Sequence, residues 1–331
     1  MGTDLKAQFG QAYRLLTERP LSLYAAAVLR IGYGLLYFVM LVREFPHRHE
    51  IWGPQSPWTP ELARQMSGDS GWFTFLTLSD GRAYFEACYA LALGTAVLFM
   101  LGWRTRAVSI VFALVVVAFY GRNVLITDGG DNLTLLMAIY LCFTACGRRW
   151  SLDSRRARRR AAPAGEGARP FTVTVVHNCA MLIIMAQMCI LYGAAGLYKV
   201  QGGLWENGTA LHYVLHSDLF RPWPALSDFV DGHHVLIGIA SYLTVLVQVA
   251  FPFSLFSKLK YVLLVILVGM HLGIAVLVGL PMFSAVMILG DAVFLPDRFF
   301  TFLAREGRAL RARRRAPRAR AINEGRAVPV R

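Results

Sequence analysis

The chain alternates long apolar runs with short polar or charged turns. The first run, LSLYAAAVLRIGYGLLYFVMLV, occupies residues 21–42. Seven more follow, at residues 84–102, 107–120, 133–147, 171–199, 235–256, 261–280 and 282–295. About 20 apolar residues in a helix cross a hydrocarbon core of roughly 30 Å. The pattern therefore predicts an all-α polytopic membrane protein with about eight transmembrane helices, and with interfacial helices on its outer face.

The composition agrees with a membrane protein and narrows its partners. Of the 331 residues, 56% are hydrophobic and 16% are charged, and the mean hydropathy is +0.47, which is too apolar for a soluble domain. We predict the lipid bilayer as a partner and no nucleic acid, although the formal net charge is +14. The five cysteines lie in or near predicted spans, where thiols act as small apolar groups, so no disulfide framework is predicted.

The excess positive charge is concentrated in short turns and in the tail. Residues 148–160 hold seven arginines against a single acid, Asp153, and the turns 103–106 and 257–260 are also basic. Loops rich in Lys and Arg stay in the cytoplasm. We therefore expect a multi-pass protein of the cell membrane with both termini in the cytoplasm.

The same pattern gives the expected division of the chain. A cytoplasmic N-terminus covers residues 1–20, a transmembrane domain 21–296 and a basic cytoplasmic tail 297–331. Residues 161–170 are expected to form a flexible connector, and those past 316 to be disordered.

The fifth apolar run ends in a lysine. Lys199 is followed by Gly202, Gly203 and Trp205, which predicts that the helix stops and the chain turns back onto the bilayer surface. An ammonium in this position either reaches out to water or faces a protein cavity, and the sequence leaves both open. Tyr192 lies two turns earlier on the same helical face. That face either lines a pocket for a flat lipid-soluble ligand such as a quinone or packs against another helix.

Other polar residues lie inside or beside the spans. Arg30 lies in the middle of the first span, where a charge is costly unless it is paired, and Glu86 and Asp291 are its candidate partners. Arg30 forms either such an ion pair or a contact to substrate or cofactor. Asp131 and Asn132 belong to a loop that also contains two glycines. Their polar side chains either stabilise an ordinary turn or bind a buried lysine or a substrate amine.

Histidines occur in two contexts. His212 and His216 are spaced to lie on one side of a helix, as two metal ligands often are, but no HExxH motif accompanies them, so no metal is assigned. A third ligand has three candidates: His233, His234 and Asp218. His271, near the middle of the seventh span, is interpreted as a hydrogen-bonded residue of the bundle rather than a catalytic one.

Four segments resemble one known family. They are AAGLYKVQGGLWENGTAL at the end of the fifth run, LRIGYGLLYF in the first, DGGDNLTLL before the fourth and RRWSLD after it. All are similar to segments of the horizontally transferred transmembrane (HTTM) domain, or vitamin K-dependent gamma-carboxylase-like, family. The resemblance extends over roughly residues 20–296 and implies a membrane enzyme fold with Lys199 as catalytic base at the outer end of its helix. In the eukaryotic carboxylase, oxygenation of a vitamin K hydroquinone is coupled to proton removal from a glutamate side chain, which then takes up carbon dioxide.

The chain also departs from the carboxylase. Tyr198 stands where the carboxylase has a second lysine, the step from Lys199 to Trp205 is one residue longer, and Asp131 and Asn132 replace a histidine expected before the fourth span. We expect no carboxylation of a clotting-type substrate, because the large extramembrane domain that engages propeptides has no counterpart here. In length the sequence resembles a bacterial branch of the family, the membrane proteins required to mature a secreted sporulation-delaying peptide toxin.

These expectations combine into a leading hypothesis and an alternative. In the first, Lys199 is the base of an enzyme that modifies or matures a secreted peptide or a quinone-type substrate at the outer face, with a quinone or hydroquinone as candidate cofactor. The substrate-binding residues are then Arg30, Asp131, Asn132, Tyr192, Trp205 and His212. In the alternative, the protein is a non-catalytic scaffold or export partner for a secreted peptide. A secondary transporter is disfavoured because no inverted repeat is visible.

Overall fold

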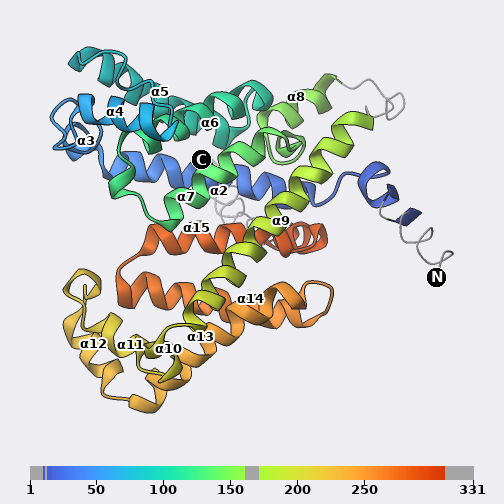
Figure 1. Ribbon diagram of the computed structural model, residues 1–331. Coiled ribbons are helices and arrows are strands. Elements are labelled where there is room, and N and C mark those ends of the chain that lie inside the picture. The colour runs from blue at the N-terminus through green and yellow to red at the C-terminus, as the bar shows by residue number, and fades with distance from the viewer. Residues whose placement is uncertain (1–9, 12, 161–170, 310–331) are drawn as a thin grey trace, which may run out of the picture.

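The computed structural model describes residues 10, 11, 13–160 and 171–309, and within these ranges it is helical and contains no strand (Figure 1). The predicted connector 161–170 and most of the predicted tail lie outside them. Six long apolar helices are long enough to cross a membrane and confirm six of the predicted spans. They are α2 (Leu23–Arg43), α5 (Arg82–Leu101), α6 (Thr105–Arg122), α9 (Phe171–Val200), α13 (His234–Ser254) and α14 (Leu259–Gly273), which continues into the π-helical turn η5 (Ile274–Val278).

The other two predicted spans are shorter helices. α7 (Gly129–Cys142) has 14 residues and α15 (Pro281–Asp291) has 11. At 1.5 Å per residue, α7 extends about 21 Å, less than a hydrocarbon core of roughly 30 Å. Both helices pack inside the bundle, where α15 contacts α2, α7 and α14. After α7 the chain passes through the 3-10 turn η3 (Cys146–Arg148).

The six long helices and α7 form two packed groups. α2, α5, α6 and α7 form one, α9, α13 and α14 form the other, and α15 runs between them (Figure 1). Close packing within each group uses glycine. A Cβ added at Gly34 of α2 would lie 3.0 Å from the backbone nitrogen of Met100 in α5, and one at Gly196 of α9 would lie 2.9 Å from that of Val249 in α13. Small residues at such crossings let helix backbones approach where no hydrophobic effect drives association.

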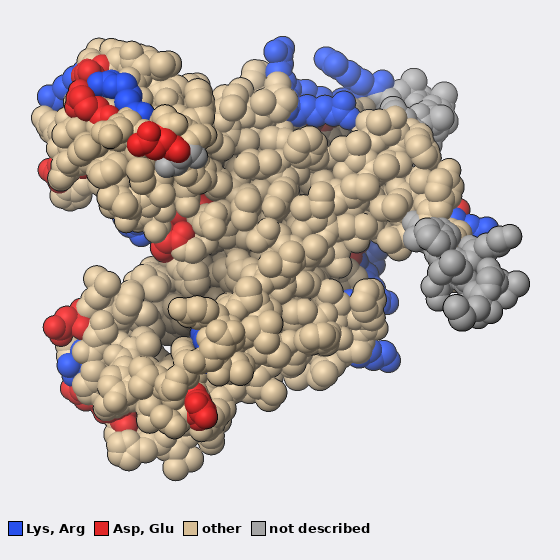
Figure 2. All heavy atoms as spheres, in the orientation of Figure 1, with Lys and Arg blue, Asp and Glu red and all other residues tan. Residues whose placement is uncertain are grey.

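The two ends of the bundle differ in charge and in structure. One end, called the basic end, carries α8 (Leu152–Arg160) and the turns α5–α6 and α13–α14. The other, called the loop end, carries the short helices that agree with the predicted interfacial ones: α3 (Arg48–Ile51), α4 (Pro60–Ser70), α10 (Gly203–Glu206), α11 (Ala210–Leu215) and α12 (Pro224–Asp231). Figure 2 shows acidic side chains in both lobes of the loop end, at the left, with a notch between the lobes, and basic side chains over α8.

Four more short 3-10 turns connect these helices. They are η1 (Phe45–His47), η2 (Val124–Ile126), η4 (Asp218–Phe220) and η6 (Ala292–Phe294).

Candidate functional site

Lys199 lies one residue before the C-terminus of α9, at the loop end, and its side chain is half-buried. Its ammonium donates to the carbonyl of Ala195 at 3.4 Å and lies 5.3 Å from the ring centroid of Trp205. Trp205 is placed there by the turn at Gly202, where the chain leaves α9 and enters α10. No carboxylate among the described residues lies within ion-pair distance of Lys199. The structure thus brings together two predicted site residues, Lys199 and Trp205.

A buried polar cluster lies deeper in the bundle. The Tyr192 hydroxyl, on α9, donates to Oδ2 of Asp291 on α15 at 3.0 Å and lies 3.2 Å from Nε2 of His271 on α14. All three side chains are buried. Because the tyrosine proton goes to Asp291, His271 donates through Nε2 and leaves Nδ1 as an acceptor.

This cluster is incompletely satisfied within the described part of the chain. His271 Nδ1 and Asp291 Oδ1 have no hydrogen-bond partner there, nor do two nearby polar atoms, Gln248 Oε1 and Ser284 Oγ. Orphaned polar groups cost free energy in a protein interior, and ionisable residues in membrane helices commonly mark functional sites. Lys199 lies seven residues beyond Tyr192 on α9, about 10 Å along the helix axis. We therefore regard Lys199 and the Tyr192–His271–Asp291 cluster as one candidate site.

Tyr192 was predicted to face either a ligand pocket or another helix, and the structure shows the helix contact on this face. Tyr192 contacts α14 and α15 through the cluster, and Met188, one turn earlier, is buried against Gly290 of α15, where an added Cβ would lie 2.7 Å from the methionine sulfur.

Asp131 and Asn132 lie on the first turn of α7 at the loop end. Asp131 forms a capping box with Asp128. The Asp131 carboxylate accepts from the backbone N–H of Asp128, and the Asp128 carboxylate accepts from that of Asp131, both at 3.0 Å. Asn132 is exposed. The same turn packs on Phe283, whose ring lies 5.8 Å from that of His271, so the start of α7 connects to the buried cluster through one aromatic side chain.

Asp131 also lines a cavity of about 360 Å³ at the loop end. Its wall includes four aromatic residues (Tyr37, Trp52, Phe119 and Tyr120) and the aliphatic Met40, Ile51, Val116 and Ile126, with the charged Arg43, Glu44 and Asp131 beside them. Tyr37 is buried, and its hydroxyl has no partner among the described residues. The volume and lining suit a flat, largely apolar ligand.

Arg30 is not part of this arrangement. Its guanidinium donates to the carbonyls of Phe99 (2.7 Å), Met100 (2.5 Å), Cys146 (3.3 Å) and Trp150 (2.7 Å) at the basic end. Neither predicted ion-pair partner contacts it, so that expectation was wrong.

The two acids proposed as partners of Arg30 have other contacts. Glu86 binds Arg48 and His49, and Asp291 binds Tyr192. The carbonyls that Arg30 binds lie near the ends of a helix and of turns, where backbone donors are scarce; that of Phe99 also accepts from the Gly102 N–H at 3.0 Å.

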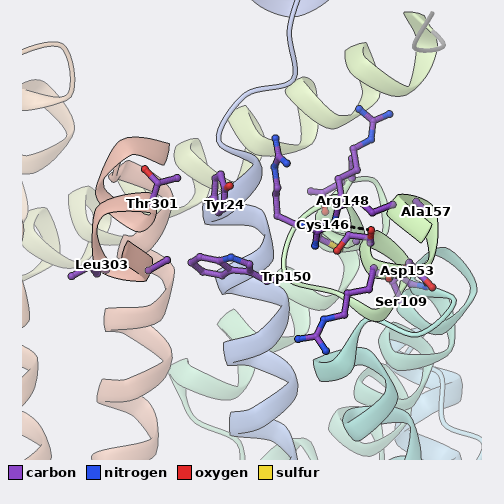
Figure 3. Close-up of a pocket in the computed structure, with 18 of the residues that line it drawn as sticks. Tyr24, Ser109, Cys146, Arg148, Trp150, Asp153, Ala157, Thr301 and Leu303 are labelled. Atoms are coloured by element: carbon purple, nitrogen blue, oxygen red, sulfur yellow. Dashed lines mark hydrogen bonds between the residues drawn. The ribbon is translucent and has the colours of Figure 1, made fainter. Parts of the chain in front are cut away.

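A cavity of about 1230 Å³ lies at the basic end (Figure 3). Arginines from three segments line it: Arg106, Arg148, Arg149, Arg155, Arg158, Arg305 and Arg308. Among the described residues that line it, Asp153 carries the one carboxylate, and this carboxylate is hydrogen-bonded to the start of α6. Asp153 accepts hydrogen bonds from the backbone nitrogens of Arg104 (3.0 Å) and Thr105 (2.7 Å) and from the Thr105 hydroxyl (2.7 Å). Asp153 therefore ties α8 to the start of α6.

Replacing Asp153 with alanine is expected to lower the free energy of unfolding by about 1–2 kcal/mol, as for other lost helix caps. Partial burial opposes ionisation, yet the bonds donated by Thr105 hold the pKa of Asp153 below its ordinary value. A lowered folded pKa gives stability that is present above about pH 4 and is lost as pH falls further. Thermal unfolding in detergent at pH 7 and pH 3 tests this. The exposed Asp69 is the control, and an equal loss in D69A would contradict the assignment.

His212 lies apart from Lys199, on α11, and contacts Asp231 at the end of α12. His212 Nδ1 is 2.7 Å from Asp231 Oδ1, and His216 Nε2 is 3.8 Å from Asp231 Oδ2. The rings of the two histidines have centroids 4.5 Å apart, which confirms that they share one side of the helix. The third member of the group is Asp231 rather than any of the three candidates named from the sequence.

The interpretation of His271 as a hydrogen-bonded residue of the bundle is confirmed, but its partner was not predicted, nor were those of Asp291 and Asp231. The partner of the first two is remote in sequence. Tyr192 is 79 residues from His271 and 99 from Asp291.

The helices and the polar site buried among them define a multi-pass helical membrane protein. The chain belongs to the HTTM domain family, which matches residues 18–298 and is a gamma-carboxylase-like membrane family, so the predicted resemblance is confirmed. The chain is similar to the uncharacterized protein YitO of Bacillus subtilis strain 168, with 25% identity over 198 residues. That match covers 58% of this chain and 60% of YitO. No solved structure matches the chain.

Proposed function

We propose that the protein is a lysine-base enzyme that modifies or matures a secreted peptide or a quinone-type substrate at the loop end. One observation carries the proposal: a half-buried ammonium, with no carboxylate in ion-pair distance among the described residues, lies two turns of α9 beyond Tyr192, which belongs to a buried, incompletely satisfied Tyr–His–Asp cluster. A carboxylate neighbour would hold the ammonium form, whereas a general base must accept a proton from its substrate. Trp205 covers the amine on one side and limits its access to water.

The aromatic cavity beside Asp131 supports a flat lipid-soluble substrate or cofactor, of which a quinone or hydroquinone is the candidate. The first turn of α7 carries Asp131 and packs on Phe283, which contacts His271. A ligand in that cavity is therefore separated from the buried cluster by the start of one helix and one aromatic ring.

The proposed orientation places the basic end in the cytoplasm and the loop end outside. α8 and the turn between α13 and α14 carry the excess of Arg and Lys at the basic end, and such segments are retained in the cytoplasm. Lys199 then faces the outer side of the cell membrane, where a secreted peptide is found.

Comparative mass spectrometry of secreted peptides and membrane quinones tests the proposal. Cells lacking the gene are complemented with the wild type, K199A or K199R, and K258A at the basic end is the matched lysine control. We expect a product with the wild type and K258A that falls at least about a hundredfold in K199A and K199R, since general bases commonly contribute 10²–10⁴-fold. Equal product in all four strains, with normal membrane insertion, would favour the alternative of a non-catalytic scaffold or export partner.

A further inference from the structure

The loop end carries a group of three potential metal ligands outside the Lys199 site. His212, His216 and Asp231 each offer one ligand atom, and these atoms lie within 4.8 Å of one another. Two of them come from α11 and its C-cap and the third from the last residue of α12. The chain between α9 and α13 therefore folds back so that two short helices present their ends to each other.

The hydrogen bonds around His216 orient it as a ligand. Its Nδ1 lies 2.9 Å from the carbonyl of His212 and donates to it, because a carbonyl only accepts. Nε2 is therefore unprotonated in the neutral ring, and this is the nitrogen that faces Asp231. A backbone carbonyl that fixes the tautomer of a ligand histidine is the usual outer-shell arrangement of metal sites.

The charge at Asp231 also favours a bound cation. Its side chain is only 14% exposed, and among the described residues its ion-pair partners are the two histidines alone. The nearest arginine in sequence, Arg221, pairs instead with Asp228. A carboxylate largely removed from water is costly unless a cation or several donors compensate it.

We propose that His212, His216 and Asp231 bind one divalent zinc ion, with a fourth position open to solvent. Two imidazoles and a carboxylate are a common zinc ligand set, and zinc holds such atoms at roughly 2.0–2.2 Å. The three ligand atoms already lie within 4.8 Å of one another, close enough to share one ion. The two histidine side chains are 43% and 42% exposed, so the ion has a path from water and keeps an open coordination position. The ion would join α11 to α12 and fix the lobe between α9 and α13.

Metal titration of the purified full-length protein tests the site. The protein carries an affinity tag without histidine, is stripped with EDTA, and is titrated with Zn²⁺ against a chromophoric chelator. We expect one Zn²⁺ per chain in the wild type, and binding weakened more than roughly tenfold in H212A, H216A and D231N. H234A, an exposed histidine three residues beyond Asp231, is the matched control and is expected to bind as the wild type does.

Two further measurements separate a metal site from a merely structural contact. Added Zn²⁺ is expected to raise the melting temperature of the wild type and of K199A, but not that of the H212A/H216A protein. Co²⁺ in place of Zn²⁺ is expected to give the visible absorption of a tetrahedral site in the wild type and in K199A, but not in the H212A/H216A protein. Equal Zn²⁺ stoichiometry and affinity in the wild type and the H212A/H216A protein would overturn the proposal. The result with K199A makes this test independent of the proposed enzyme function.

Discussion

Replacing Arg30 with alanine is expected to lower the free energy of unfolding by about 3–5 kcal/mol. The side chain is fully buried, and its guanidinium binds four backbone carbonyls. Two of them belong to the last turn of α5 and lie at the negative end of its dipole. The Phe99 carbonyl keeps the hydrogen bond from the Gly102 N–H, but alanine would remove the guanidinium donor from all four acceptors and leave a cavity in the interior. The yield of monodisperse protein after heating in detergent is the measurement.

Two controls make the Arg30 result specific. R106A removes an exposed arginine from the same end and is expected to change stability by less than about 0.5 kcal/mol. R30K keeps the charge but lacks the planar fork, so it is expected to recover only part of the loss. If R30A melted within a degree or two of the wild type, the carbonyls would have another source of donors, and the assigned role of Arg30 would be wrong.

Arg30 also shows what the sequence can and cannot predict about this fold. An arginine inside an apolar run signals a buried, compensated charge, and the structure agrees. The identity of its partners was not predictable, because the acceptors are backbone carbonyls 69 to 120 residues away rather than acidic side chains. Backbone acceptors have no signature in a sequence, so acids in other spans were the only visible candidates.

The helices themselves follow from apolar length. The six long helices were predicted within a few residues, since a run of about 20 apolar residues has few other stable forms in a bilayer. α7 and α15 are as apolar as the membrane-spanning helices but shorter. Their apolar side chains are covered by other helices of the bundle. Composition alone does not distinguish lipid from protein as the apolar surroundings of a helix.

The candidate site was predictable in its local part only. Lys199 and Trp205 are six residues apart, so a helix end followed by a glycine turn was enough to bring them together. His212 and His216 were predictable for the same reason, by helical spacing. His271 and Asp291 join Tyr192 through contacts between helices that are distant in sequence, and no local pattern signals such pairs. Asp231 joins His212 across the turn between two short helices, 19 residues away, which helical spacing does not predict either.

The largest expected effect on activity besides that of Lys199 is at Asp291. We expect D291N to lower the product of the comparative mass-spectrometry experiment at least about tenfold, while the melting temperature stays within a few degrees of the wild type. Asparagine has the same shape, and its Oδ1 still accepts the hydrogen bond from Tyr192. The substitution removes the ionisable carboxylate, whose Oδ1 has no hydrogen-bond partner among the described residues. Packing does not require this group, but a proton transfer can use it.

Ser284→Ala is the matched control for Asp291, on the same helix. The Ser284 hydroxyl is also buried without a partner in the described part of the chain, so its removal is expected to leave product unchanged and stability equal or slightly higher. A D291N protein with full product would remove the buried cluster from the site and leave Lys199 alone. A parallel fall in product and melting temperature would instead assign Asp291 a purely structural role. Loss of product at unchanged stability is the result that a proton-handling site predicts, because functional groups are kept in apolar interiors despite their cost to folding.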